Sequence, residues 1–142
     1  MYLSHFQPAE RKEMINSNVY DYVNVLGKTA DAAWMRNEII ANNLANANTP
    51  GYKRQDINFE QTLSRALGES RYESVDSKVR HLSGAELKPQ VFTDASNFSY
   101  RLDKNNVDPD TESVELAANQ IKYNGLLTGI NQEFKNLQIV LK

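Results

Sequence analysis

The 142-residue sequence has no cysteine, which excludes disulfide bonds and thiolate metal sites. Its two histidines, His5 and His81, each lack a second metal ligand three or four residues away. Asp103, Asp108 and Asp110 lie close together, but glycine and glutamate are missing from the sixth and twelfth positions of a calcium loop. These aspartates are better explained as turn and capping residues. The sequence therefore predicts no bound metal and no cofactor.

The sequence also lacks an excess of positive charge and a long apolar run. With 16 Lys and Arg against 18 Asp and Glu, the net charge is −2, which argues against nucleic acid as a partner. No apolar run approaches the ~20 residues of a transmembrane helix. Glu10, Glu13 and Asp21 interrupt the region where a signal peptide has its apolar core. We therefore expect neither membrane insertion nor a cleaved signal.

Sequence patterns that indicate catalysis are missing as well. We find no glycine-rich phosphate loop, no nucleophile elbow and no nucleophile beside a base. The sequence therefore predicts a protein that is not an enzyme.

The most distinctive stretch, residues 42–53, reads Asn-Asn-Leu-Ala-Asn-Ala-Asn-Thr-Pro-Gly-Tyr-Lys. Asparagine competes with the helical backbone through its side-chain amide and favours helix ends. Pro50 cannot continue a helix, and Gly51 can adopt the positive φ of a tight turn. The stretch therefore predicts a helix end followed by a turn. Its candidate assembly residues are Asn42, Asn43, Leu44, Asn46, Asn48, Thr49, Pro50, Gly51 and Tyr52.

This stretch resembles the N-terminal signature of bacterial flagellar rod and hook proteins. The resemblance implies a structural building block whose two terminal helices form the core of a tube in the flagellar basal body. It implies export through the flagellar apparatus without a cleaved signal. It also implies contacts with other rod proteins, the membrane-ring adapter protein, the export apparatus and further copies of the chain. A weaker similarity covers Asn105 to Asp108 and Glu115 to Asn124, and it fits the short proximal rod proteins, of which two types stay open.

Residues 18–48 are predicted to form a long helix. Apolar residues recur there at alternating spacings of four and three, the pattern of a coiled-coil seam. Asn37 is the one polar residue in this seam, and such a residue can fix the register of two helices at some cost in stability. The predicted seam consists of Val23, Leu26, Ala30, Ala33, Asn37, Ile40 and Leu44.

Residues 109–141 are predicted to form a second long helix. Asp108 is a suitable N-cap, Pro109 suits the first helical position, and Glu112 complements the helix dipole. The helix offers more apolar surface than one partner helix can cover, which is typical of an assembly interface. Its predicted seam contains Leu116, Tyr123, Leu127, Ile130, Phe134 and Leu137.

Residues 49–108 between the helices are expected to be largely irregular. Asn58 could cap a short helix that ends near Leu67. The polar residues 69–86 predict a loop. Short strands are predicted at residues 91–93 and 98–102, joined by a turn.

The predicted fold is thus mainly α: two long N- and C-terminal helices packed as a coiled-coil-like pair, with a short irregular, β-containing middle region. We expect residues 1–17 to form a mobile leader and residues 18–142 a single rod-type domain. Met14 is a candidate natural start. We also expect Asn43 and Asn46 to be surface amides that bind a neighbouring subunit and add little to the stability of the monomer.

The functional hypothesis is a structural subunit of the proximal flagellar rod that self-assembles with other rod proteins and transmits torque for motility. The alternative is a free-standing helical adaptor or type III export chaperone. That alternative would explain both amphipathic helices but not the asparagine-rich stop at residues 42–52.

Overall fold

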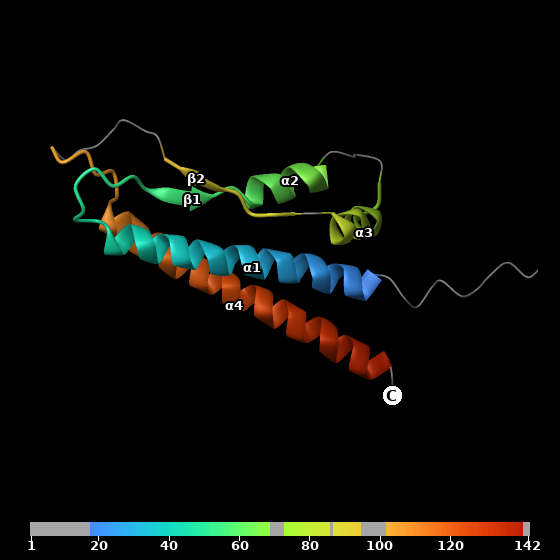
Figure 1. The fold of residues 1–142 in the computed structure, drawn as a ribbon. Helices are drawn as coiled ribbons and strands as arrows, with labels where there is room; N and C mark the ends of the chain where they lie inside the picture. The colour runs from blue at the N-terminus through green and yellow to red at the C-terminus, as the bar shows by residue number, and fades with distance from the viewer. Residues whose placement is uncertain (1–17, 69–72, 86, 95–101, 141–142) are drawn as a thin grey trace, which may run out of the picture.

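The computed structural model describes residues 18–68, 73–85, 87–94 and 102–140. In chain order, its elements are α1 (Asn18–Ala45), β1 (Gln55–Ile57), α2 (Glu60–Gly68), α3 (Val75–Gly84), β2 (Val91–Thr93) and α4 (Pro109–Val140). Figure 1 shows α1 and α4 as a long pair, with the other elements along one side of α1. The predicted fold class is confirmed. The predicted leader and the candidate start at Met14 lie outside the described residues.

The two long helices run antiparallel, so the start of α1 and the end of α4 lie at the same end of the pair (Figure 1). At ~1.5 Å per residue, α1 spans about 42 Å and α4 about 48 Å. Near one end of the pair, the side chains of Asn43 and Glu112 are hydrogen-bonded. Farther along, the rings of Trp34 and Tyr123 lie 6.0 Å apart. Contact therefore extends along much of both helices.

The seam between the helices combines small and large side chains on α1. Ala30, Ala33 and Ile40 are buried as predicted. On α4, Glu112 and Asn119 are the buried residues among those whose side chains are described, and both are polar. Eight of the ten other predicted seam residues are half-buried: Val23, Leu26, Asn37, Leu44, Leu116, Tyr123, Ile130 and Leu137.

Two predicted seam residues on α4 are only partly covered. Leu127 is 38% exposed and Phe134 is 46% exposed. Both lie about 40° around α4 from the buried Glu112 and Asn119 or farther, towards the side of Trp34. They therefore border the seam instead of filling it, and they form the edge of the predicted helix interface.

Helix α1 ends at Ala45, three residues before the predicted end at residue 48. Beyond it, the backbone bonds tighten: the N–H of Ala47 donates to the carbonyl of Leu44, and that of Thr49 to Asn46. Gly51 then has a φ of 73°, the left-handed region that glycine enters without strain. The predicted turn at Gly51 is therefore confirmed, but residues 46–48, which were predicted to be helical, belong to this turn and not to α1.

The predicted strand at Val91–Thr93 is confirmed, with an unpredicted partner. It pairs antiparallel with β1, and Asp56 lies opposite Phe92. Strand β1 has three residues, too few for a period-two pattern to stand out in the sequence. Of the second predicted strand, 98–102, only Leu102 is described, and it lies in a turn.

Helix α3 replaces much of the loop predicted for residues 69–86, so that prediction was wrong. The Ser74 hydroxyl caps the helix by accepting from the N–H of Ser77. Val79 and Leu82 are buried, and α3 packs against α1. From α1, Lys28 Nζ donates to the carbonyls of Leu82, Ser83 and Ala85 at the C-terminus of α3, where a cation is favoured. The apolar spacing was too sparse to predict this helix, but tertiary contacts stabilise it. The short helix predicted up to Leu67 is confirmed as α2.

Replacing Leu82 by alanine should lower the free energy of unfolding by about 2–4 kcal/mol, because the change leaves a cavity between α3 and α1. Urea denaturation would measure this loss. Val75→Ala is the matched control, since Val75 lies on the same helix and is 63% exposed. Equal urea midpoints for both variants would show that α3 is not docked on α1.

Candidate functional site

The candidate site is built around Asn43, whose side chain is fully buried. Its Nδ2 donates to the carbonyl of Gln55 (2.8 Å) and to Glu112 Oε2 (2.9 Å). Its Oδ1 accepts from the N–H of Gln55 (3.0 Å) and the hydroxyl of Tyr52 (3.3 Å). Every donor and acceptor of the amide is used. Asn43 thus joins α1, β1 and α4 at one point.

Glu112 brings a charge into this buried site, with only 1% of its surface exposed. Arg54 Nε donates to Glu112 Oε1, while Asn43 serves the other oxygen. Burial acts to lower the pKa of Arg54, but the hydrogen bond to Glu112 and the charges of Glu112, Asp56 and Glu115 outweigh it. The pKa of Arg54 is therefore raised above its ordinary value. A buried carboxylate needs such a partner, because unpaired burial of a charge is costly.

Arg36 on α1 extends the charged cluster. Its Nε lies 3.1 Å from Asp56 Oδ1, as an ion pair without hydrogen-bond alignment, and its Nη2 donates to Glu115 Oε2 at 3.0 Å. Arg54 Nη2 bonds to the same two acidic residues, each at 3.1 Å. Two guanidinium groups from α1 and the segment before β1 therefore bind three carboxylates from β1 and α4. We call the cluster of Asn43, Arg36, Arg54, Asp56, Glu112 and Glu115 the polar clasp.

Asn105 completes the C-terminus of α1 from a distant part of the chain. Its side chain is buried, and its Nδ2 lies 2.9, 3.0 and 2.9 Å from the carbonyl oxygens of Asn46, Ala47 and Thr49. The carbonyls of Asn46 and Thr49 each accept one backbone N–H of the turn, from Thr49 and Tyr52, and Asn105 adds a second donor to each. The segment that leads into α4 therefore caps α1.

The neighbouring residues hold the same turn in place. Asn106 Oδ1 accepts from the N–H of Arg54 (2.7 Å), and the N–H of Gly51 donates to the carbonyl of Asp103 (2.8 Å). Asp108 accepts from the Thr111 hydroxyl and the N–H of Asp110, and these bonds lower the pKa of Asp108. Capping by the ionised carboxylate is therefore fully present above the ordinary pKa of aspartate and is lost as the pH falls through the lowered value.

Asn119 makes two hydrogen bonds across the middle of the seam. Asn119 Nδ2 donates to the carbonyl of Ala33 (2.7 Å) and to Asn37 Oδ1 (2.9 Å). Asn37 is therefore partnered across the helix pair, as a register-setting residue should be. Removing it would take a hydrogen-bond acceptor from the buried amide of Asn119.

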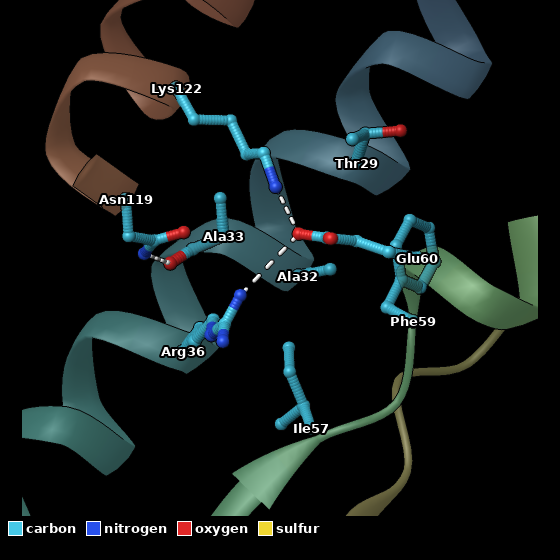
Figure 2. Close-up of a pocket in the computed structure, with 9 residues that line it drawn as sticks. All are labelled: Thr29, Ala32, Ala33, Arg36, Ile57, Phe59, Glu60, Asn119 and Lys122. Carbon is cyan, nitrogen blue, oxygen red and sulfur yellow. Dashed lines mark hydrogen bonds and ion pairs between the residues drawn. The ribbon is translucent and has the colours of Figure 1, made fainter. Parts of the chain in front are cut away.

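Figure 2 shows the hollow beside the clasp, between α1, α4 and the start of α2. Lys122 and Arg36 both reach the carboxylate of Glu60 across its mouth. The space that remains is about 20 Å³, enough for a single water molecule. In the part of the chain that the structure describes, no group of three or more His, Cys, Asp or Glu could hold a metal ion. None of the helices there is long and apolar enough to span a bilayer.

Comparisons with known proteins match this region. A model of the flagella basal body rod protein family matches residues 24–53, from α1 through the turn. The flagellar basal body rod protein FlgB of Bacillus subtilis is 36% identical over 108 residues, covering 75% of this chain and 82% of that protein. The FlgB proteins of Salmonella typhimurium (35% over 114 residues; 75% and 83%) and Borreliella burgdorferi (37% over 123 residues; 79% and 89%) are similarly alike.

The chain belongs to the FlgB family of flagellar basal body rod proteins. The resemblance inferred from residues 42–53 is thereby confirmed, and the FlgB-type proximal rod protein is the member that it matches. The family-model match ends at Lys53, one residue before Arg54. The clasp thus joins the matched segment of this rod protein to β1 and α4.

The structure separates the predicted assembly residues into three groups by their exposure. Asn42, Asn48, Thr49, Pro50 and Gly51 are exposed. Leu44, Asn46 and Tyr52 are half-buried, and Asn46 Nδ2 donates to the carbonyl of Asn42. The expectation that Asn43 is a surface amide was wrong, because all its bonds are made within the chain. Asn46 is also partly engaged in its own turn.

Sequence reasoning missed most of the clasp. Glu112 was assigned only to the helix dipole, Asn105 and Asn106 fell in the region expected to be largely irregular, and Arg36, Arg54 and Asp56 were given no role. Their partners lie up to 79 residues away, as for Arg36 and Glu115, and no local period links them. One signal was present: Glu112 follows the N-cap Asp108 by four residues, on the face that also carries the predicted seam residue Leu116.

Asn43→Ala should lower the free energy of unfolding of this rod protein by about 2–5 kcal/mol, because the change leaves Glu112 and the backbone of Gln55 short of partners. Chemical denaturation followed by circular dichroism would measure it. Asn42→Ala is the matched control, one residue away but exposed, and should change stability by less than about 0.5 kcal/mol. Equal effects would contradict the clasp.

Proposed function

We propose that this protein is a structural subunit of the proximal rod that assembles with copies of itself and other rod proteins and transmits torque. Its family membership supports a structural role in the flagellar basal body. The finer parts of the proposal are contacts with the membrane-ring adapter protein and export through the flagellar apparatus without a cleaved signal.

One observation carries the assembly role: α4 has an exposed apolar side. Val114 is 69% exposed, Ile121 74% and Ile139 73%. These residues are seven and eighteen positions apart, two and five turns of helix, so they lie along one line on α4. That line faces away from Glu112 and Asn119, the residues buried against α1. A large exposed apolar surface on a helix favours binding to another protein.

The clasp has a supporting role in this proposal. It fixes the register of α1 and α4 from one end, and so determines where the exposed side chains of α4 lie. Of the asparagine-rich stretch, we propose Asn42, Asn48, Thr49 and Pro50 for contact with neighbouring subunits, since these residues are exposed on the turn. A free-standing adaptor or export chaperone gains no support from the relatives, which are named as rod proteins.

Ile121→Lys should abolish or strongly reduce swimming, because a charge on the exposed side of α4 would have to be buried in an assembly contact. The variant would be expressed in cells that lack the wild-type gene, and motility, export and presence in isolated basal bodies would be measured. Purified variant and wild type should unfold within about 0.5 kcal/mol of each other, since Ile121 is exposed in the monomer.

Ile121→Val is the matched control, because it keeps an apolar side chain at the same place, and it should swim normally. Normal swimming of the Ile121→Lys variant would contradict a role of this side of α4 in assembly. Absence of the wild-type protein from basal bodies would contradict the rod function as a whole.

A further inference from the structure

The helix pair has one covered side and one bare side. On the covered side, the cations of both helices are engaged: Lys28 with α3, Arg36 with Asp56 and Glu115, and Lys122 with Glu60. Figure 1 shows α2, α3 and the two strands along this side of α1. Trp34 lies on the other side of the seam, about 160° around α1 from Arg36. No described element covers that side in the same way.

Exposed aromatic and apolar residues gather on the bare side. Tyr20 and Trp34 are each 56% exposed, and they lie fourteen residues apart, on one line of α1. Trp34 contacts Tyr123, and the half-exposed Leu127 and Phe134 follow it along α4. We call the surface formed by Tyr20, Gly27, Asp31, Trp34, Leu127 and Phe134 the aromatic face.

The aromatic face has an uncovered glycine, Gly27, and a negative charge, Asp31, one helical turn apart. Gly27 lies midway between Tyr20 and Trp34, and a side chain built at Gly27 would meet no atom within 4 Å. Four residues later, one helical turn on, Asp31 is exposed and forms no ion pair with a described lysine or arginine. An occupant should therefore carry an apolar side chain and a cation one helical turn apart.

The far part of α4 carries that pair. Ile139 is 73% exposed, and Lys135, also exposed, lies four residues before it. If Ile139 of a second copy sits over Gly27, an α4 that runs antiparallel to α1 brings Lys135 to Asp31. The same antiparallel relation holds between α1 and α4 within one chain. The two copies would then point in the same direction.

We propose that the aromatic face binds the end of α4 of a second copy, with Ile139 over Gly27 and Lys135 beside Asp31. The two contacting surfaces differ, since one is the middle of α1 and the other the end of α4. A contact between unlike surfaces repeats from copy to copy and builds a ring or an open helical array, where a like-to-like contact would stop at a dimer. This inference rests on the proposed function, because it supplies the self-contact of a rod subunit.

Disulfide trapping tests the contact, and the wild-type chain itself can form no disulfide because it has no cysteine. The variant Gly27→Cys/Ile139→Cys would be expressed as the sole copy, and isolated basal bodies would be oxidised and run on a non-reducing gel. We expect a ladder of linked copies, since each subunit carries both halves of the contact. A link within one chain is excluded: Gly129 is the α4 residue near Leu26, and Ile139 lies ten residues, or about 15 Å, farther along.

Gly27→Cys/Val114→Cys is the matched control, because Val114 is nearly as exposed as Ile139 and lies on the same line of α4 but at its other end. It should give no ladder. Two outcomes would overturn the inference while leaving the rod function intact: unlinked subunits in basal bodies that contain the protein, or linkage only to another rod protein. Absence of the protein from basal bodies would instead contradict the proposed function.

A charge exchange provides a second measurement. Asp31→Lys and Lys135→Asp should each weaken swimming strongly, and the combined variant should restore most of it, because the ion pair is re-formed with its partners reversed. Glu73→Lys, which makes the same charge change at an exposed residue before α3, should have no effect. A combined variant as poor as the worse single variant would overturn the pairing, as would equal loss in Glu73→Lys.

Discussion

The structure depends on one buried carboxylate. Glu112 lies in the first turn of α4, out of contact with water, and is held by Arg54 and Asn43. Breaking such a pair from one side costs about 3–5 kcal/mol, since the remaining charge stays buried. Through this contact the end of α1, the first strand and the start of α4 reach their places together. The turn that follows α1 is then closed by Asn105, which carries the chain into α4.

The polar residues that bind α4 to α1 have a consequence for assembly. The buried residues of α4, among those whose side chains are described, are Glu112 and Asn119. Both are held by directional interactions, namely hydrogen bonds and, for Glu112, an ion pair. Directional contacts set a register that apolar packing between alanine side chains would leave less sharply defined. They also leave much of the apolar surface of α4 uncovered, at Val114, Ile121 and Ile139. A single copy therefore has a defined shape and an unsatisfied surface, the two properties that a building block needs.

The helix pair has a covered and a bare side because the residues between the two long helices pack on one side only. Residues between the long helices supply α2, α3 and the two strands, and all of these lie along one side of α1 (Figure 1). Lys28 and Arg36 project to that side, where they bind α3 carbonyls and the acidic residues of the clasp. Trp34 and Asp31 face the other way. The uneven distribution of charge around α1 is thus a result of the intrachain contacts.

The sequence by itself determined the two long helices, the turn at Gly51, the short helix α2 and the family, because each is written in local periodicity or in a contiguous motif. It did not determine α3 or β1, whose few apolar residues matter only against α1 or β2. Nor did it reveal that Asn43 is buried. Asparagine is favoured near a helix end whether that end is exposed to water or buried in a core, so its presence there does not indicate burial. Only the tertiary structure decided this, because the groups that satisfy Asn43 and Glu112 come from segments that are distant in sequence and meet only when the helices pair.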